Sequence, residues 1–367
     1  MSVLSAPRPV LQGKAAISGL ILAALLCVCL PGGLAAQPFG KFLSLSGGNA
    51  GITVPTSPSL NPTGALTVEA WVFVSTLTAD YQDIAGKGWQ ETWGLFVTPG
   101  GKLRSYVRGY VSGDPLRTLR EGGLIPVGSW THVAVVFNGA TRFHYINGEL
   151  AGSWAEPAAL TTDTKPVEIG NDPDYPNRTL HGAIDEVRVW NVGRAQTQIQ
   201  STLHGFTGST STAGLVAFWA LDGNANDIFA GHNGSPIAPL SFAQIFSPGS
   251  CVPTATDLCL NSRFLIFGTY RVGNTDQPRG TANRVAVSNP GSGLFWFFSP
   301  DNWEVMIKEI NACGLNSRHW IFSAATTNVF YQLNVIDTVA GVQKIYFNYP
   351  GPPAPAVTDT DAFGTCP

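Results

Sequence analysis

The chain has 367 residues, of which 44% are hydrophobic and 12% are charged, and its formal net charge is −3. Such sparse and balanced charge argues against a nucleic-acid-binding protein and against an electrostatically bound membrane protein, because both need a basic surface. The 41 glycines and 26 prolines are typical of a protein built from strands and turns. The length is sufficient for two domains.

Residues 1–36 are predicted to be a cleaved signal peptide. Arg8 and Lys14 precede an apolar run, Ala15–Leu30, and a Pro-Gly-Gly break then leads to small residues suited to cleavage. The run is shorter than the ~20 apolar residues that cross a bilayer. We therefore expect an exported protein with no membrane span after cleavage. The periplasm, the cell surface and the medium all stay open as destinations.

The chain from residue 37 to residue 246 has the pattern of a β-sandwich. Leu66–Val74 alternates strictly and is largely apolar on both faces, which predicts a strand inside a two-layer structure. One short helix is expected at Ala195–Leu203, after a break at Gly193. The remaining predicted strands are Phe42–Leu45, Trp93–Thr98, Leu103–Tyr110, Trp130–Phe137, Phe143–Ile146, Val167–Ile169 and Ala183–Trp190.

Several motifs in this region occur in the order found in a known family. They read FLSLSG, LTVEAWVFV, GSWTHVAVVFNGATRFHYINGELAG, VEIGND and LHGAIDEVRVWNVGRAQTQIQ. This order resembles the laminin-G-like jelly roll, which is grouped with the concanavalin A-like lectins and glucanases and with the pentraxins. The resemblance implies a domain that binds a glycan or an extracellular or surface protein, and it leaves the choice open. Gly214–Ser235 is expected to complete this sandwich.

Catalysis is not expected, although relatives of this fold include glucanases. Asp185 and Glu186 are the nearest candidates for a catalytic pair, but adjacent strand residues point to opposite faces. We expect Asp185 to accept hydrogen bonds from backbone amides and Glu186 to be solvated. His132 is interpreted as a core residue, and common catalytic motifs such as GxSxG and HExxH are absent from the sequence. A polysaccharide-acting enzyme and a structural envelope component remain the alternatives.

Two loops could hold calcium, which relatives of this type bind at the rim of the sandwich. Calcium prefers six to eight oxygen ligands. The first loop offers Asp172 and Asp174, and the second offers Asp222, Asn224 and Asp227. The alternative is that these side chains only build turns between strands.

Aromatic side chains in loops are the candidates for ligand contacts. Lys87 lies between Gly86 and Gly88, and Trp89 follows directly. We expect these glycines to leave the side chains of Lys87 and Trp89 exposed. Tyr110 and Tyr175 are further candidates for a stacking surface.

Residues 251–367 are predicted to form a second, smaller β-sandwich after a linker at residues 247–250. Its four cysteines predict two disulfides with three possible pairings, of which we favour Cys251–Cys259 and Cys313–Cys366. A zinc site is disfavoured because no CxxC pair is present. The predicted strands are Arg263–Tyr270, Arg284–Ser288, Leu294–Ser299, Val305–Ile310, His319–Ala324, Val329–Ile336 and Lys344–Asn348.

One stretch of this region, GLFWFFSPDNWEVMIKEINACG, resembles a module attached to various exported bacterial proteins, and the resemblance implies no activity. The continuous apolar run Leu294–Phe298 predicts a strand buried on both faces. The expected fold is therefore all-β, with an antiparallel jelly-roll sandwich followed by a smaller disulfide-braced β-sandwich.

Overall fold

The computed structural model describes the greater part of the chain. No described helix is long and apolar enough to cross a membrane. The predicted signal peptide and Tyr110 lie outside the described residues. These are 40–108, 119–156, 159–172, 174–203, 205, 211–244, 249–287, 289–351 and 354–367, all within the compact unit Leu34–Pro367.

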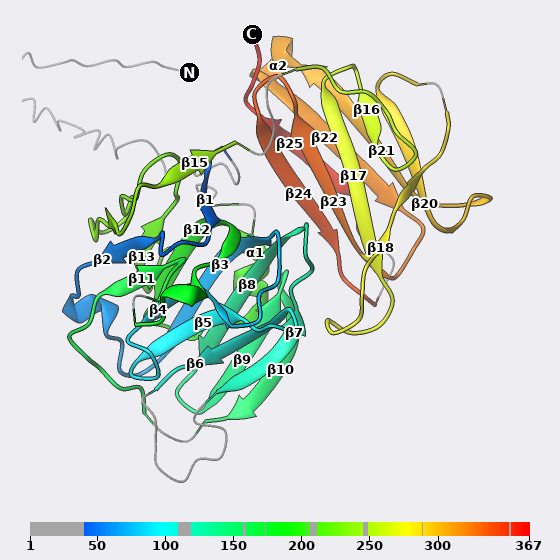
Figure 1. Ribbon diagram of the computed structural model, residues 1–367. Coiled ribbons are helices and arrows are strands. Elements are labelled where there is room, and N and C mark those ends of the chain that lie inside the picture. The colour runs from blue at the N-terminus through cyan, green and yellow to red at the C-terminus, as the bar shows by residue number, and fades with distance from the viewer. Residues whose placement is uncertain are drawn as a thin grey trace, which may run out of the picture. The chain divides into compact units, whose positions relative to one another are not determined.

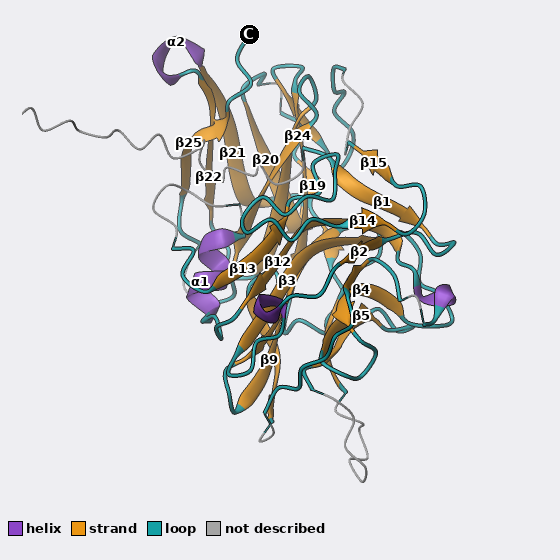
Figure 2. Ribbon diagram, turned by 90° about the vertical axis from the view of Figure 1, so that its left-hand side faces the viewer, coloured by secondary structure: helices purple, strands orange, loops and turns teal. Residues whose placement is uncertain are grey.

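The first sandwich consists of two antiparallel sheets, as Figures 1 and 2 show. Among the described residues, the eight-stranded sheet has the order β10-β9-β8-β3-β12-β1-β15, with β13 also paired to β12. Its strands are β1 (Phe42–Ser46), β3 (Leu66–Val74), β8 (Trp130–Phe137), β9 (Thr141–Ile146), β10 (Glu149–Ala155), β12 (His181–Trp190), β13 (Leu215–Trp219) and β15 (Ser241–Ala243).

The seven-stranded sheet has the order β14-β2-β11-β4-β5-β6-β7 among the described residues. Two short 3₁₀ helices, η1 (Pro58–Leu60) and η2 (Pro176–Arg178), lie in the loops of this sandwich. The strands are β2 (Ile52–Val54), β4 (Gln82–Lys87), β5 (Trp93–Val97), β6 (Lys102–Tyr106), β7 (Arg120–Leu124), β11 (Val167–Ile169) and β14 (Ser235–Pro236).

Strand β3 occupies the position that its alternation predicted. Leu66, Val68 and Val72 point into the main core, where they pack with side chains of the opposite sheet such as Ile84. Because side chains alternate along a strand, Trp71 and its alternate neighbours lie on the other face. Trp71 is also fully buried. The prediction of a strand covered on both faces is therefore confirmed.

Helix α1 (Gln196–Thr202) covers that second face (Figure 2). Ile199 and Leu203 pack in one apolar cluster with Trp71. The indole nitrogen of Trp71 donates a hydrogen bond to the carbonyl oxygen of Leu203 over 3.1 Å. The predicted short helix is confirmed, and it covers this face together with Phe347, whose ring stacks on that of Trp71.

The second sandwich also has two antiparallel sheets. One contains β16 (Leu258–Leu260), β17 (Phe264–Arg271), β18 (Gly280–Thr281), β23 (Phe330–Asp337) and β24 (Val342–Asn348). The other contains β19 (Asn283–Arg284), β20 (Ser292–Ser299), β21 (Asn302–Ala312), β22 (Arg318–Ala325) and β25 (Val357–Phe363).

Both favoured disulfide pairings are confirmed. Cys251 is bonded to Cys259, eight residues away, and Cys313 is bonded to Cys366, 53 residues away. Cys313 opens the one-turn helix α2 (Cys313–Asn316) between β21 and β22. The second bond therefore ties the C-terminus to the end of a central hairpin.

The prediction that Leu294–Phe298 is buried on both faces is wrong. Phe295 and Phe297 lie in the core of the second sandwich, but Phe298 is 53% exposed. Met306 on the neighbouring strand β21 is also exposed. An antiparallel sheet can carry apolar side chains on its open face as well, so an apolar run alone does not distinguish the two situations.

Candidate functional site

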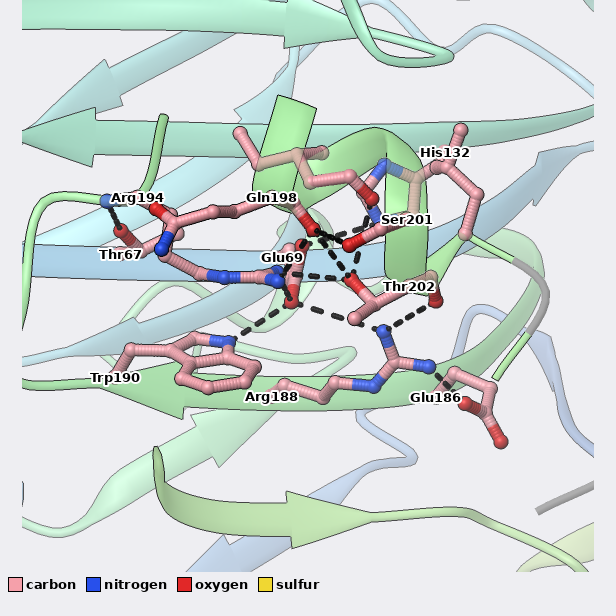
Figure 3. Close-up of polar contacts among 12 residues, drawn as sticks. Thr67, Glu69, His132, Glu186, Arg188, Trp190, Arg194, Gln198, Ser201 and Thr202 are labelled. Carbon is pink, nitrogen blue, oxygen red and sulfur yellow. Dashed lines mark hydrogen bonds and ion pairs between the residues drawn. The ribbon is translucent and has the colours of Figure 1, made fainter. Parts of the chain in front are cut away.

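The face of the eight-stranded sheet under α1 holds a buried polar network (Figure 3). Glu69 of β3 lies at its centre and accepts hydrogen bonds from Trp190 Nε1 at 2.8 Å and from Arg194 Nη1 at 2.7 Å. Arg188 Nη1 lies 3.7 Å from the same carboxylate oxygen, and His132 Nε2 lies 3.5 Å from the other. Each of these five side chains is at least 95% buried.

The charges of this network stabilise one another. Burial alone would raise the pKa of Glu69, but the charge of Arg194, the hydrogen bond with His132 and the charge of Arg188 outweigh burial and lower the pKa to about 2. Glu186 is also buried and contacts Arg188, so the expectation that Glu186 is solvated is wrong. It adopts a positive φ of 55° where β12 is bulged, and the bulge turns it inward. We interpret the network as structural.

A pocket of about 140 Å³ lies on the other sheet, on the face that points away from the core. Glu168 lies between Val167 and Ile169, which both enter the core, so its side chain points to the opposite face. Asp83 precedes the core residue Ile84 on β4, so the side chain of Asp83 also points away from the core. A cavity of this size holds about one six-membered ring. Its lining comprises Asp83, Gly86, Lys87, Gly88, Trp89, Tyr106, Lys165, Pro166, Glu168, Asn171, Asp172 and Asp174.

Glycines in the strands allow an aromatic floor to form. A Cβ atom on Gly94 of β5 would lie 2.5 Å from the ring of Tyr106, so only glycine lets this ring lie against the sheet. The hydroxyl of Tyr106 donates a hydrogen bond to the carbonyl oxygen of Gly88 at 2.9 Å. Trp89 meets Tyr106 edge to face, with ring centres 5.7 Å apart.

Three carboxylates that line the pocket each have a buried oxygen without a hydrogen-bond partner. They are Asp83, Glu168 and Asp172, and each is at least 91% buried. The other oxygen of Glu168 accepts a hydrogen bond from Thr53 at 3.0 Å. Buried polar atoms rarely lack partners in native proteins, so such a group of unpaired oxygens indicates a functional site.

Burial and mutual repulsion raise the pKa values of these carboxyl groups. Burial, with a smaller contribution from the charge of Asp172, raises the pKa of Glu168 to about 7. Burial and the charge of Asp172 also raise the pKa of Asp83 well above its usual range. Glu168 can therefore bind a proton near neutral pH.

Arg178 fixes the aromatic side of the pocket. Its guanidinium carbon lies 4.2 Å from the ring centre of Trp89 and 4.0 Å from that of Tyr175. Its Nη1 lies 3.6 Å from Asp172 Oδ2. The structure thus brings the predicted ligand residues Trp89 and Tyr175 together through a residue that sequence reasoning had not selected.

The expectation that Lys87 is exposed is wrong. Its side chain is fully buried, and its Nζ donates hydrogen bonds to Asp163 at 2.6 Å, to Thr56 at 3.0 Å and to the carbonyl oxygen of Lys165. Asp163 lies 76 residues further along the chain, so the sequence around Gly86 and Gly88 gave no sign of this ion pair. Lys87 supports the pocket wall and has no free charge to offer a ligand.

The second predicted calcium loop is organised by its own backbone. Both oxygens of Asp227 accept hydrogen bonds from backbone amides, among them those of Phe218 and His232, and the pKa of Asp227 is lowered despite its burial. Asp222 accepts from the amide of Lys41, and Asn224 accepts from the amide of Asn226. These are the contacts of turn-forming residues.

The first predicted calcium loop lies at the pocket. Asp172 Oδ1 accepts a hydrogen bond from the amide of Asp174, and Asp172 Oδ2 faces Arg178. The nearby guanidinium disfavours a metal cation at this oxygen. Calcium binding at either loop stays a prediction.

Sequence reasoning missed the acidic side of the pocket. Asp83, Glu168, Tyr106 and Arg178 were not selected, although Glu168 carries one sequence signal. A single acid between two β-branched residues, as in Val-Glu-Ile, marks the outward face of a strand whose other face is buried. The pairing of β11 with β4, which places Glu168 opposite Gly86, was not visible in the sequence.

Residues 46–200 match a family described as the concanavalin A-like lectin/glucanases superfamily. The predicted laminin-G-like resemblance is confirmed for this part of the chain. The match does not reach the second sandwich, so the resemblance of its segment to a module of exported proteins stays a prediction. A search of curated proteins found no match.

Solved structures with similar folds share little sequence with this chain. A candidate carbohydrate-binding protein from Bacteroides ovatus is 21% identical, with a TM-score of 0.46; the match covers 56% of this chain and 60% of that protein. A heptameric SAP-like pentraxin from Limulus polyphemus is 14% identical over 57% of this chain and 96% of its own, with a TM-score of 0.40. The sialidase CBM40 of Ruminococcus gnavus bound to α2,3 sialyllactose is 14% identical, with a TM-score of 0.37; the match covers 45% of this chain and 98% of that protein.

Proposed function

We propose that this protein is an exported, non-enzymatic glycan-binding protein and that the pocket beside Trp89 holds one sugar ring of its ligand. One observation supports this proposal above the others. A ring-sized cavity combines an aromatic floor, Tyr106 and Trp89, with carboxyl groups whose oxygens lack partners. Binding sites for small polar ligands have this combination of apolar surface and a few placed polar groups.

Each part of the pocket has a role in this proposal. The apolar face of a pyranose ring would pack on Tyr106 and Trp89, where aromatic area contributes most of the contact. Hydroxyl groups of the sugar would donate hydrogen bonds to Asp83 and Glu168 and would thereby satisfy buried oxygens. Arg178 would hold Trp89 in place by stacking on it.

Export is part of the proposal, because the two disulfides suit an oxidising compartment outside the cytosol. The second sandwich would then serve as an accessory or attachment module. We propose that recognition at the pocket needs no calcium, because Asp227 is held by backbone amides and Asp172 faces Arg178. An extracellular protein ligand remains the alternative that the experiment below distinguishes.

A glycan array with the mature protein tests the proposal. We expect binding to a restricted set of glycans, with loss of most of the signal in Trp89→Ala and in the isosteric variant Asp83→Asn. Trp303→Ala is the matched control, because Trp303 is a 50% exposed tryptophan of the second sandwich. Circular dichroism establishes that each variant is folded. Equal binding by the wild type and both pocket variants would contradict the proposed site, and no binding to any glycan would contradict the function.

Glycoside hydrolysis is a second candidate, and one observation favours it. Glu168, with a pKa of about 7, shares the pocket with other carboxyl groups, and an enzyme needs such an acid beside an ionised partner. Incubation with each array-positive glycan, followed by analysis of products, distinguishes the two functions. Products that disappear in Glu168→Gln would establish an enzyme, and intact glycans would support a binding protein.

A further inference from the structure

More acidic than basic side chains lie at the pocket. Four acids line it, Asp83, Glu168, Asp172 and Asp174, against two lysines, and Arg178 lies beside Asp172. Lys87 is held by Asp163 and is fully buried. Lys165, the other lysine, is paired with Glu91 at 3.1 Å and with Asp174 at 3.4 Å. Asp83 and Glu168 therefore have no basic partner within ion-pair distance among the described residues.

We propose that the pocket selects a sugar that carries a free amine, so that the ligand is a polymer or oligomer of non-acetylated amino sugar. This inference rests on the proposed glycan-binding function and names the class of glycan. The ammonium group would occupy the acidic side of the pocket, which Asp83 and Glu168 line. The sugar ring would occupy the aromatic side, on Tyr106 and Trp89.

The buried oxygens are an observation independent of the number of acids. Asp83 is 6% exposed and Glu168 is 9% exposed, and each has an oxygen that meets no donor of the protein. A carboxylate without a partner is costly to bury, whereas the same group beside a cation is stabilised. A hydroxyl would satisfy one such oxygen, but an ammonium group has three donors and a positive charge that compensates the acids as a group.

The spacing of the acids argues for an organic cation over a metal ion. Among the described residues, only Cys313, His319 and Cys366 bring three possible ligand atoms within 4.8 Å of one another. Two of these belong to a disulfide and have no thiolate to offer. No three described acids of the pocket therefore bring oxygen atoms within this distance of one another.

The aromatic side of the pocket also determines how the ligand would be oriented. Arg178 already occupies stacking positions on Trp89 and Tyr175, so a second cation has less of these rings available. The ligand's charge is consequently directed to Asp83 and Glu168 and its apolar ring face to the floor. An N-acetylated sugar would present a neutral amide to the acids and would leave them without a counter-charge.

Three tetrasaccharides with the same β-1,4 backbone and different C2 groups test the inference by titration calorimetry at pH 6.5. They are the tetramers of glucosamine, N-acetylglucosamine and glucose. We expect the glucosamine tetramer to bind the wild type about 10- to 100-fold more tightly than the other two, since hydrogen bonds to charged groups exceed neutral ones by about this factor. We expect Asp83→Asn and Glu168→Gln each to remove most of this preference, and Glu121→Gln, an exposed acid on β7, to keep it.

Proton release gives a second readout that a merely structural role would not produce. An ammonium group beside Asp83 and Glu168 favours their ionised forms, so binding of the amine should release protons, and the heat should differ between buffers of different ionisation enthalpy. Equal or tighter binding of a neutral tetramer would overturn the inference and leave glycan binding intact. Tighter binding of N-acetyl-lysine methylamide than of glucosamine would overturn it in favour of a peptide amine. Failure of all three tetramers in a protein that binds other array glycans would overturn the inference alone.

Discussion

Replacement of Glu168 by glutamine should stabilise the protein at high pH and leave it unchanged at low pH. Glutamine has nearly the same shape and can still accept the hydrogen bond from Thr53. It removes a carboxyl group that is unfavourable to ionise, because burial raises its pKa from 4.5 to about 7. A buried acid with a raised pKa binds its proton more tightly in the folded state than in the unfolded state.

The pH window follows from this difference. Below pH 4.5 the acid is protonated in both states, and it causes no loss of stability. Between pH 4.5 and about 7 the unfolded state loses its proton first, so the stability of the wild type falls as the pH rises and then levels off. The full shift corresponds to about 3 kcal/mol. We expect about 2 kcal/mol, since water at the pocket mouth screens part of the charge.

Urea unfolding of the wild type and Glu168→Gln at pH 4.5 and pH 8 measures the effect. The variant should gain about 2 kcal/mol relative to the wild type at pH 8 and close to nothing at pH 4.5. Glu121→Gln is the matched control, because this exposed acid should change stability by no more than about 0.5 kcal/mol at either pH. Destabilisation of Glu168→Gln at pH 8 would refute the reasoning, since it would mean that the carboxylate is favourably paired in the free protein.

Three further results are expected. Glu69→Gln should lower the free energy of unfolding by about 3 kcal/mol at pH 7, because it leaves buried arginines without their counter-charge. Since the pKa of Glu69 is about 2, this loss should shrink as the pH falls from 4.5 toward 2. A loss that does not change with pH would argue against the ion pairs. The double replacement of Cys313 and Cys366 by serine should cost about 4 kcal/mol in urea unfolding, as the loop of 53 residues is no longer closed, and a negligible cost would contradict this bond. The unfolding midpoint should be the same in millimolar calcium and in EGTA; a rise with calcium would reveal a site that binds the ion in the folded state.

The sequence allowed the central strands to be predicted because their information is local. The alternation in Leu66–Val74 and Trp130–Phe137 follows the pleat, and the short helix after Gly193 follows strand β12, which ends at Trp190. The disulfide pairs were also accessible, since Cys251 and Cys259 are close in the chain and only one other pair then remains.

The pocket could not be predicted because it depends on long-range pairing. Asp83 and Glu168 lie 85 positions apart, and they line one pocket because β11 pairs with β4 in one register. Lys87 depends on Asp163 in a distant loop, so its burial was not visible either. The prediction that Glu186 is solvated was wrong for a related reason. It assumed regular alternation along β12, and a bulge breaks that alternation.

A crystal structure of the mature protein with an array-positive oligosaccharide would test the proposed site most directly. We expect a sugar ring on Tyr106 and Trp89, with a donor of the ligand about 3 Å from a carboxyl oxygen of Asp83 or Glu168. A sugar bound instead on the exposed face that carries Phe298, with nothing in the pocket, would contradict it.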